Sequence, residues 1–405
     1  MGNISSCADA RSIDAQRSKA GASSRKLMIA LYTSAVFLYW MALYLYVPTL
    51  PTYVESKSDN LALVGVVLSM YGLWQAVIRL PLGIVADWVG RRKPFILGGF
   101  ALAGLGAYIM GAANEVNGLL IGRAITGLAA GTWVPLVTLF SGLYPPEQAV
   151  KASSLLTLIG SVGRVLATGV TGSLNEIGGY PLAFFLAAAA AGLAILIVLP
   201  SKENARPPQR PSVETLTLLT RRDVLVPSLL SSVAQYANWA TTFGFIPILA
   251  KQLGATDITL SILLSLNIGV YTLGNLLATG IADRIDARNL VYLGFGLLTV
   301  GIAGAAIAPS LALVFVMQFI MGLGQGISYP VLMGLSIRHV EDAQRTTAMG
   351  LHQSVYAIGM FSGPALSGVI ADALGIRPML GVTAAACLIL GAMGAQWLRD
   401  NRHRG

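Results

Sequence analysis

The sequence contains very few charged residues for its length. Only 11% of its 405 residues are Asp, Glu, Lys or Arg, whereas soluble domains carry roughly 25%. Hydrophobic residues make up 55% of the chain, and the mean hydropathy is +0.69. So little charge would not keep a globule of this size in solution, so the composition excludes an ordinary soluble protein.

Cysteine and histidine are also scarce. The two cysteines, Cys7 and Cys387, lie far apart and predict neither a disulfide framework nor a metal site. The three histidines form no metal-spaced cluster, and the sequence has no phosphate-binding loop and no nucleophile–base pair. No polar segment is long enough for a nucleotide-binding domain. These absences argue against an enzyme or an ATP-driven pump and predict no catalytic residue, metal or cofactor.

Long apolar runs, by contrast, are abundant. A helix needs about 20 apolar residues to cross a bilayer, and these runs are continuous rather than alternating, which favours helices over barrel strands. We therefore predict an all-α membrane protein with twelve transmembrane helices. The expected spans are 28–50, 61–83, 94–114, 118–142, 152–174, 181–200, 225–250, 259–282, 289–308, 310–336, 346–371 and 378–398.

Basic residues are distributed unevenly between the predicted loops. Most of the 27 Lys and Arg residues lie in the tails and in the even-to-odd connections, and the opposite loops hold only Lys57, Lys251 and Arg377. Because cytoplasmic loops are enriched in Lys and Arg, both termini are predicted to be cytoplasmic, in a plasma (inner) membrane protein. The net charge of +9 follows from this topology. It requires no nucleic-acid partner, and the expected surroundings are the lipid bilayer.

The two halves of the chain repeat each other. Trp40 and Tyr44 in the first span match Trp239 and Phe243 in the seventh. Such a repeat predicts two fused bundles that enclose a site near the membrane midplane. The predicted parts are a tail (1–27), a six-helix bundle (28–200), a cytoplasmic linker (201–224), a second six-helix bundle (225–398) and a tail (399–405).

An acid followed by arginines ends the second span, and a weaker copy ends the eighth. Residues 83–92 read GIVADWVGRR, and residues 280–288 read GIADRIDAR. The acid is placed to accept hydrogen bonds from a helix N-terminus and to pair with the arginines, which would latch the halves together on the cytoplasmic side. The alternative is that the basic residues only anchor the loop on anionic lipid. The candidate gating residues here are Gly83, Asp87, Gly90, Arg91, Arg92 and Asp283.

These motifs resemble those of the major facilitator superfamily over residues 28–398. The residues 83–92 match its cytoplasmic loop signature, and Arg123 with Gly127 matches its fourth-helix signature. Residues 46–51, YVPTLP, are similar to the first-helix ending of twelve-helix drug:proton antiporters, although the fifth-helix antiporter signature is incomplete. The resemblance implies two pseudo-symmetric six-helix bundles that alternate between inward and outward access, in a chain that acts as a monomer.

Charge inside the predicted spans is limited to three arginines, Arg79, Arg123 and Arg164, and no Asp or Glu lies well inside a span. Because a buried unpaired charge is costly, each arginine should face protein, water or an anionic ligand. Arg79 is also placed to pair with Asp87, and a structural role is the alternative for all three. His352 is the candidate proton-coupling residue, because histidine titrates near physiological pH; an interfacial structural role is its alternative.

Aromatic and amide side chains recur within the predicted spans. A cavity with aromatic walls suits amphipathic organic molecules of varied shape. Amides inside a bilayer need partners and so more often face the protein interior. The candidate substrate-binding residues are Trp40, Tyr44, Arg123, Arg164, Gln235, Asn238, Trp239, Phe243, Gln318, Tyr329 and Tyr356. Further cavity candidates of the second half are Asn267, Tyr271, Asn275, Gln325 and Gln353.

Three functions remain open on the sequence alone. The preferred one is secondary active transport, with proton-coupled efflux of a small amphipathic organic solute or drug. The membrane arginines favour an alternative, transport of organic anions or anionic lipids, with or without coupling. The third is a non-transporting membrane receptor or scaffold built on the same fold.

Overall fold

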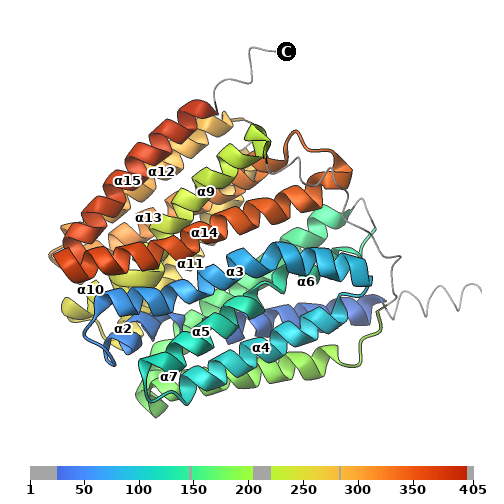
Figure 1. Cartoon of the computed structure of the whole chain (residues 1–405), viewed down its shortest axis with the longest axis horizontal. Helices are drawn as coiled ribbons and strands as arrows, with labels where there is room; N and C mark the ends of the chain where they lie inside the picture. The colour runs from blue at the N-terminus through green and yellow to red at the C-terminus, as the bar shows by residue number, and fades with distance from the viewer. Residues whose placement is uncertain (1–24, 146–147, 204–219, 282–283, 399–405) are drawn as a thin grey trace, which may run out of the picture.

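The computed structural model describes residues 25–145, 148–203, 220–281 and 284–398, which are almost entirely helical (Figure 1). Ten helices in these ranges are long and apolar enough to span a membrane. One of them, Ser154–Val198, contains two predicted spans, which are separated by a break in the helix geometry at Gly178 and Gly179. The seventh span is not among the ten, since it carries several Ser, Asn and Gln side chains. The predicted all-α membrane fold is confirmed.

The helices fall into two consecutive groups. The first comprises an unlabelled helix (residues 25–44), η1 (Val47–Thr49), α2 (Leu50–Glu55), α3 (Leu61–Val89), α4 (Lys93–Gly111), α5 (Val116–Ala130), α6 (Trp133–Ser141) and α7 (Ala149–Val198). The second comprises α9 (Arg222–Ala240), η4 (Thr241–Phe245), α10 (Ile246–Gln252), α11 (Asp257–Ile281), α12 (Ala287–Ala306), α13 (Leu311–Ile337), α14 (Asp342–Leu374) and α15 (Ile376–Trp397). In Figure 1 the first group, in blue to green, occupies the lower part and the second the upper part.

The first and seventh spans are interrupted at equivalent points. The first helix ends in a turn and the short helix η1, which contains Pro48. The seventh span passes through the π-helical turn η4 and resumes as α10, which contains Pro247. Proline lacks a backbone donor and disrupts the helical hydrogen bonds before it. The matching interruptions therefore follow from the sequence repeat.

Contacts inside each group show the same repeat. A Cβ atom on Gly127 of α5 would lie 2.9 Å from the Tyr71 carbonyl oxygen of α3. A Cβ atom on Gly322 of α13 would lie 2.7 Å from the Asn267 carbonyl oxygen of α11. These glycines bring neighbouring helix backbones close together, as small residues do in membrane bundles.

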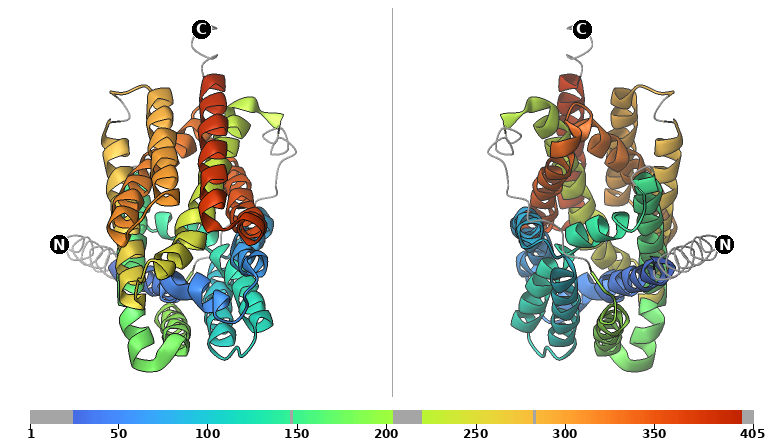
Figure 2. Two further views of the ribbon diagram at one scale, coloured as in Figure 1. Left: turned by 90° about the vertical axis from the view of Figure 1, so that its left-hand side faces the viewer. Right: turned by 90° about the vertical axis from the view of Figure 1, so that its right-hand side faces the viewer.

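The two groups meet along two helix pairs. The pair α3 and α14 lies side by side through the middle of the molecule (Figures 1 and 2), and α7 packs on α11. The backbones touch where the side chains are smallest. A Cβ atom on Gly65 would lie 2.3 Å from the Pro364 carbonyl oxygen, and one on Gly172 would lie 2.4 Å from the Ile258 Cα. Both contacts lie toward the end that carries the odd-to-even loops.

Candidate functional site

A cavity of about 180 Å³ lies between the two groups of helices and is lined by side chains of both. Most of the predicted substrate-binding residues meet there, together with one predicted gating residue. The predicted residues that line the cavity are Trp40, Tyr44, Arg79, Arg164, Gln235, Asn238, Trp239, Phe243, Tyr329 and Tyr356.

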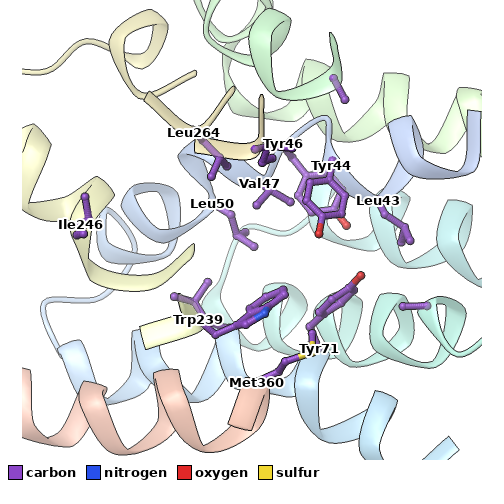
Figure 3. Close-up of a cluster of buried hydrophobic side chains, with 14 of the residues drawn as sticks. Leu43, Tyr44, Tyr46, Val47, Leu50, Tyr71, Trp239, Ile246, Leu264 and Met360 are labelled. Atoms are coloured by element: carbon purple, nitrogen blue, oxygen red, sulfur yellow. The ribbon is translucent and has the colours of Figure 1, made fainter. Parts of the chain in front are cut away.

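The cavity has an aromatic wall that crosses from one group of helices to the other. Trp239 stacks on Tyr71 with ring centroids 5.2 Å apart, and on Phe243 with centroids 4.7 Å apart. Phe243 meets Tyr44 edge-on at 6.2 Å, and Tyr44 contacts Trp40 at 5.6 Å. Figure 3 shows Trp239 beside Tyr71, with Tyr44 approaching from the first helix. Aromatic pairs at these distances stabilise one another beyond their buried area, so the rings form one continuous surface across both groups of helices.

Arg164 presents a cation at the Trp40 end of this wall. Its guanidinium carbon lies 4.8 Å from the centre of the Trp40 ring and 5.7 Å from that of Tyr44. Its Nε donates to the Gly160 carbonyl at 3.3 Å, and its Nη2 donates to the Ser161 hydroxyl at 3.0 Å. Among the described residues it has no carboxylate partner, so only neutral groups and aromatic faces stabilise its charge.

Arg79 enters the cavity from α3 and connects the two groups. Its guanidinium donates to the Tyr356 hydroxyl of α14 and to the Gln75 side-chain oxygen of its own helix. The guanidinium carbon also lies 5.1 Å from the centre of the Tyr356 ring. The predicted pairing with Asp87 stays a prediction, because the Asp87 side chain lies outside what the structure describes.

Arg123 and Gln318 lie outside the cavity lining. Arg123 is 2% exposed, and its guanidinium carbon lies 4.1 Å from the centre of the Tyr71 ring, which forms part of the wall. Gln318 is 1% exposed, and its side-chain oxygen accepts a hydrogen bond from Asn267 at 2.7 Å. In this conformation both residues support cavity-lining residues from behind.

His352 is fully buried and does not line the cavity. Its Nδ1 lies 3.1 Å from the Ser228 hydroxyl oxygen on α9, and its Nε2 has no described partner. Its ring meets Tyr356 edge-on at 5.9 Å. The structure thus places His352 of α14 against α9, where it contacts the cavity-lining Tyr356 without reaching the cavity itself. Its role in proton coupling remains a prediction.

Several cavity residues were not among the predicted site residues. One group lies on α3, where Tyr71 and Gln75 precede Arg79 at intervals of four residues. That spacing places all three on one face of a helix. Tyr71 and Gln75 could therefore have been predicted as cavity residues from the position of Arg79. The other unpredicted ones are Trp133, Thr157, Gly160, Ile268 and Met360, whereas Asn267, Tyr271, Asn275 and Gln325 were among the further cavity candidates of the second half. They come from many different helices, which no single periodicity connects.

Polar contacts close the cavity at the end with the odd-to-even loops, which we call the outer latch. Asp257 at the start of α11 is its centre, because its carboxylate lies 2.6 Å from the Lys251 Nζ and accepts from the Asn175 amide at 2.9 Å. The same amide donates to the Thr49 hydroxyl at 2.9 Å. Asp372 of α14 accepts from the Leu61 backbone N–H, at the N-terminus of α3, at 3.0 Å. Both carboxylates therefore connect one half to the other.

We predict that Asp257→Ala weakens this closure. The variant loses the carboxylate that Lys251 and Asn175 share, and hydrogen bonds of this type contribute about 1–2 kcal/mol. The fraction of molecules open at this end should therefore rise about 5- to 30-fold. Labelling of Asn238→Cys by a membrane-impermeant maleimide, in a background without Cys7 and Cys387, measures that fraction. Glu176→Ala, an exposed acid at the same end, is the control; equal labelling in both variants would refute a latching role.

At the opposite end, the loop with the signature of residues 83–92 is held by Glu203, an acid that was not among the predicted site residues. Glu203 follows α7, and its two carboxylate oxygens accept from the backbone N–H groups of Arg92 at 2.7 Å and Lys93 at 2.8 Å. This is the arrangement favoured at a helix N-terminus, here that of α4. Gly90 ends α3 with φ of 68°, a left-handed conformation that suits glycine.

The cytoplasmic latch itself stays a prediction. Arg91 is exposed, and a Cβ atom on Gly83 would meet only the Val134 side chain, at 3.5 Å. The side chain of Asp87 and all of Asp283 lie outside the described residues. The described contacts of this loop connect α4 to the end of α7, within the first half of the chain.

Glu203→Ala is expected to lower the stability of the first half. The variant leaves two N-terminal donors of α4 without their carboxylate, a loss of about 1–2 kcal/mol. The thermal unfolding midpoint in detergent should therefore fall by a few degrees. Glu115→Ala provides the comparison, because Glu115 precedes α5 without making a side-chain cap. An unchanged midpoint for Glu203→Ala would show that this cap is not needed.

Comparisons with known proteins agree with this architecture. The sequence matches the Major Facilitator Superfamily over residues 32–231 and again over residues 228–405. It is 23% identical to the quinolone resistance protein NorA of Staphylococcus aureus (strain MRSA252) over 359 residues, which cover 86% of this chain and 90% of NorA. Over a shorter stretch of 120 residues it is 32% identical to the inner membrane transport protein YajR of Escherichia coli (strain K12), covering 29% of this chain and 26% of YajR.

Solved structures share the fold at low sequence identity. A bacterial homologue of the human lysosomal transporter Spinster, in an inward-facing and occupied conformation, superposes with a TM-score of 0.78 at 17% identity, covering 92% of this chain and 97% of that one. The nucleoside transporter NupG superposes with a TM-score of 0.73 at 16% identity, covering 92% and 99%. The predicted arrangement of two six-helix bundles is thereby confirmed. The chain belongs to the Major Facilitator Superfamily and is an integral membrane transporter of that family.

Proposed function

We propose that the chain exports small amphipathic aromatic molecules from the cytoplasm by alternating access. The observation that carries this proposal is the aromatic wall, which runs from Trp40 through Tyr44 and Phe243 to Trp239 and so belongs to both halves of the molecule. A flat apolar ligand would find stacking partners there, with amide groups to orient it. NorA, a relative named for quinolone resistance, supports an organic drug-like cargo.

The direction of opening follows from the proposed topology. If both termini are cytoplasmic, as the loop charges predict, the outer latch of Asp257 and Asp372 faces the outside. The structure then represents the state that is closed to the outside. Release would require the latch to open while the helices close at the other end. The domain boundaries at 200/201 and 224/225 belong to this proposal, with each six-helix bundle moving as a unit.

Proton coupling is a separate part of the hypothesis. The described residues that line the cavity include no Asp, Glu or His, although a titrating group in the cavity is the usual way to couple proton and substrate binding. The geometry therefore supports export more directly than it supports a proton site in the cavity.

Liposome flux tests the proposed function. Purified protein is reconstituted, and the release of a fluorescent amphipathic dye is followed with and without a pH gradient. Dye release above that of protein-free liposomes is expected, and Trp239→Ala should reduce it. A receptor or scaffold would release none of the dyes. Dye release that is independent of the pH gradient at every pH would refute proton coupling but would still agree with export.

A further inference from the structure

We infer that the cavity takes a planar aromatic anion, such as a ring bearing a carboxylate or sulfonate, and that the membrane potential drives its export. This inference rests on the proposed export function and specifies its substrate class and energy source. The cations of the cavity, the donors that have no partner, and the absence of acids from the described lining together carry it.

The first observation is the incomplete coordination of Arg164. Its Nε and Nη2 donate to Gly160 and Ser161, but its Nη1 donates to no described residue. The guanidinium lies over the Trp40 ring at the edge of the aromatic wall. A carboxylate or sulfonate is the group that pairs best with a guanidinium in such a site. An attached ring could then lie along the wall toward Tyr44.

The second observation is that two further donors of the cavity lining lack a partner, while one acceptor of the lining, the Gln325 Oε1, lacks one as well. The Trp40 Nε1 is buried without a hydrogen-bond partner, and so is the Arg79 Nε. Both residues line the same cavity as Arg164. Unpaired buried donors are rare in proteins, and a bound acceptor would satisfy them. Among the buried polar atoms of the described lining, donors without a partner therefore outnumber acceptors without one by two to one.

The third observation concerns charge balance. The described lining contains two arginines and no Asp or Glu. The two carboxylates of the outer latch, Asp257 and Asp372, bind Lys251, Asn175 and the Leu61 N–H instead. A monovalent cation placed about 6 Å from a guanidinium would bind about 100-fold more weakly than a neutral isostere, at an effective dielectric constant of about 20. The cavity thus discriminates against lipophilic cations.

An anionic substrate also changes the energetics of export. Moving one negative charge out of a cell that is negative inside is favourable. A potential of 100 mV supports a concentration ratio of about 50. A transporter of such a substrate would need no proton-binding group in the cavity, which agrees with the lining described above. The substrate class thereby accounts for the missing carboxylate.

Ligand binding to the full-length protein tests the substrate class. The probes are naphthalene-2-sulfonate, its neutral sulfonamide, a naphthyl trimethylammonium cation and an anionic lysolipid. We expect the sulfonate to bind most tightly, Arg164→Gln to weaken it about 10- to 100-fold, and Arg164→Lys to recover part of the loss. The sulfonamide should be unaffected by Arg164→Gln, which a merely structural defect would not allow. Arg288→Gln is the matched control, because Arg288 stacks over Tyr292 outside the cavity.

Each alternative outcome counts against the inference. Equal binding of all three naphthyl probes, or tighter binding of the cation, would overturn the anion assignment. Binding of the lysolipid without the sulfonate would overturn the choice of a soluble aromatic substrate. These results are independent of flux, so they stand even if the proposed export function fails.

Flux in liposomes tests the energy source. Sulfonate movement is followed under a potassium diffusion potential at equal pH, and under a pH gradient at zero potential. We expect the potential to drive sulfonate flux and Arg164→Gln to abolish it. Flux that follows only the pH gradient would refute the membrane potential as the driving force. Flux of the cation alone would preserve an exporter but reject this substrate class, and no flux of any probe would reject the proposed export function.

Discussion

Gly65→Leu is expected to abolish transport by holding the molecule open at the end with the outer latch. A Cβ atom on Gly65 would lie 2.3 Å from the Pro364 carbonyl oxygen and 2.9 Å from the Gly368 Cα. Both of these are backbone atoms of α14, so no side-chain rotation would relieve the collision. Overpacking of this kind costs about 1–3 kcal/mol or more. The closed state would therefore become about 5- to 150-fold less populated, or more.

Two measurements separate this effect from misfolding. Cavity labelling from the latch side, at Asn238→Cys, should rise in Gly65→Leu while flux in liposomes falls to background. Gly98→Leu is the matched control, because Gly98 also lies in a long helix but a Cβ there would meet no atom within 4 Å. Normal flux in Gly65→Leu would contradict the closure as the structure shows it. A folded protein that is labelled no faster than the parent would do the same.

Trp239→Ala should cause a large loss of binding for any aromatic substrate, whatever its charge. Trp239 is 5% exposed and stacks on both Tyr71 and Phe243, so it joins the parts of the aromatic wall that α3 and η4 contribute. Truncating a central aromatic residue of a binding surface typically costs 2 kcal/mol or more. We therefore expect affinity for an aromatic substrate to fall by about 30-fold or more. Equilibrium binding of a fluorescent naphthyl probe measures the change.

The same chain provides controls for this loss. Trp397→Ala removes a tryptophan that is 70% exposed at the end of α15, far from any cavity-lining residue in sequence, and should leave affinity unchanged. Trp239→Phe retains a ring for stacking and should recover most of the affinity. If Trp239→Phe binds as poorly as Trp239→Ala, the indole N–H and not the stacked ring is what the ligand needs.

Much of the site could be predicted from local sequence patterns, because several cavity-lining residues are spaced four apart on the same helix. The four-residue spacing of Trp40 with Tyr44, and of Trp239 with Phe243, indicated single helix faces, and all four residues line the cavity. Tyr71, Gln75 and Arg79 have the same four-residue spacing, but only Arg79 was a predicted site residue. Periodicity reports which residues share a face, but not which face meets the other half of the molecule.

The three membrane arginines show where sequence reasoning stops. Their residue type predicted that each needs protein, water or an anion around it. Which of these each one has depends on residues far away in the chain: Arg79 bonds to Tyr356, and Arg123 stacks against Tyr71. All three keep at least one guanidinium nitrogen without a described hydrogen-bond partner, and for Arg164 that nitrogen is Nη1 in the cavity lining. Glu203, which caps α4 from 110 residues away at Lys93, is a second case of the same kind.

The duplicated bundle of membrane helices can be read from the amino-acid order alone, because the bilayer requires long apolar runs with internally satisfied backbones. The family can be read from it too, through motifs whose residues lie close together in the chain. The folded molecule was needed to show which charges face the cavity, which donors lack a partner, and at which end the halves are closed. Those properties arise from contacts between helices such as α3 with α14 and α7 with α11, and no local pattern records which surfaces two rigid halves bring together.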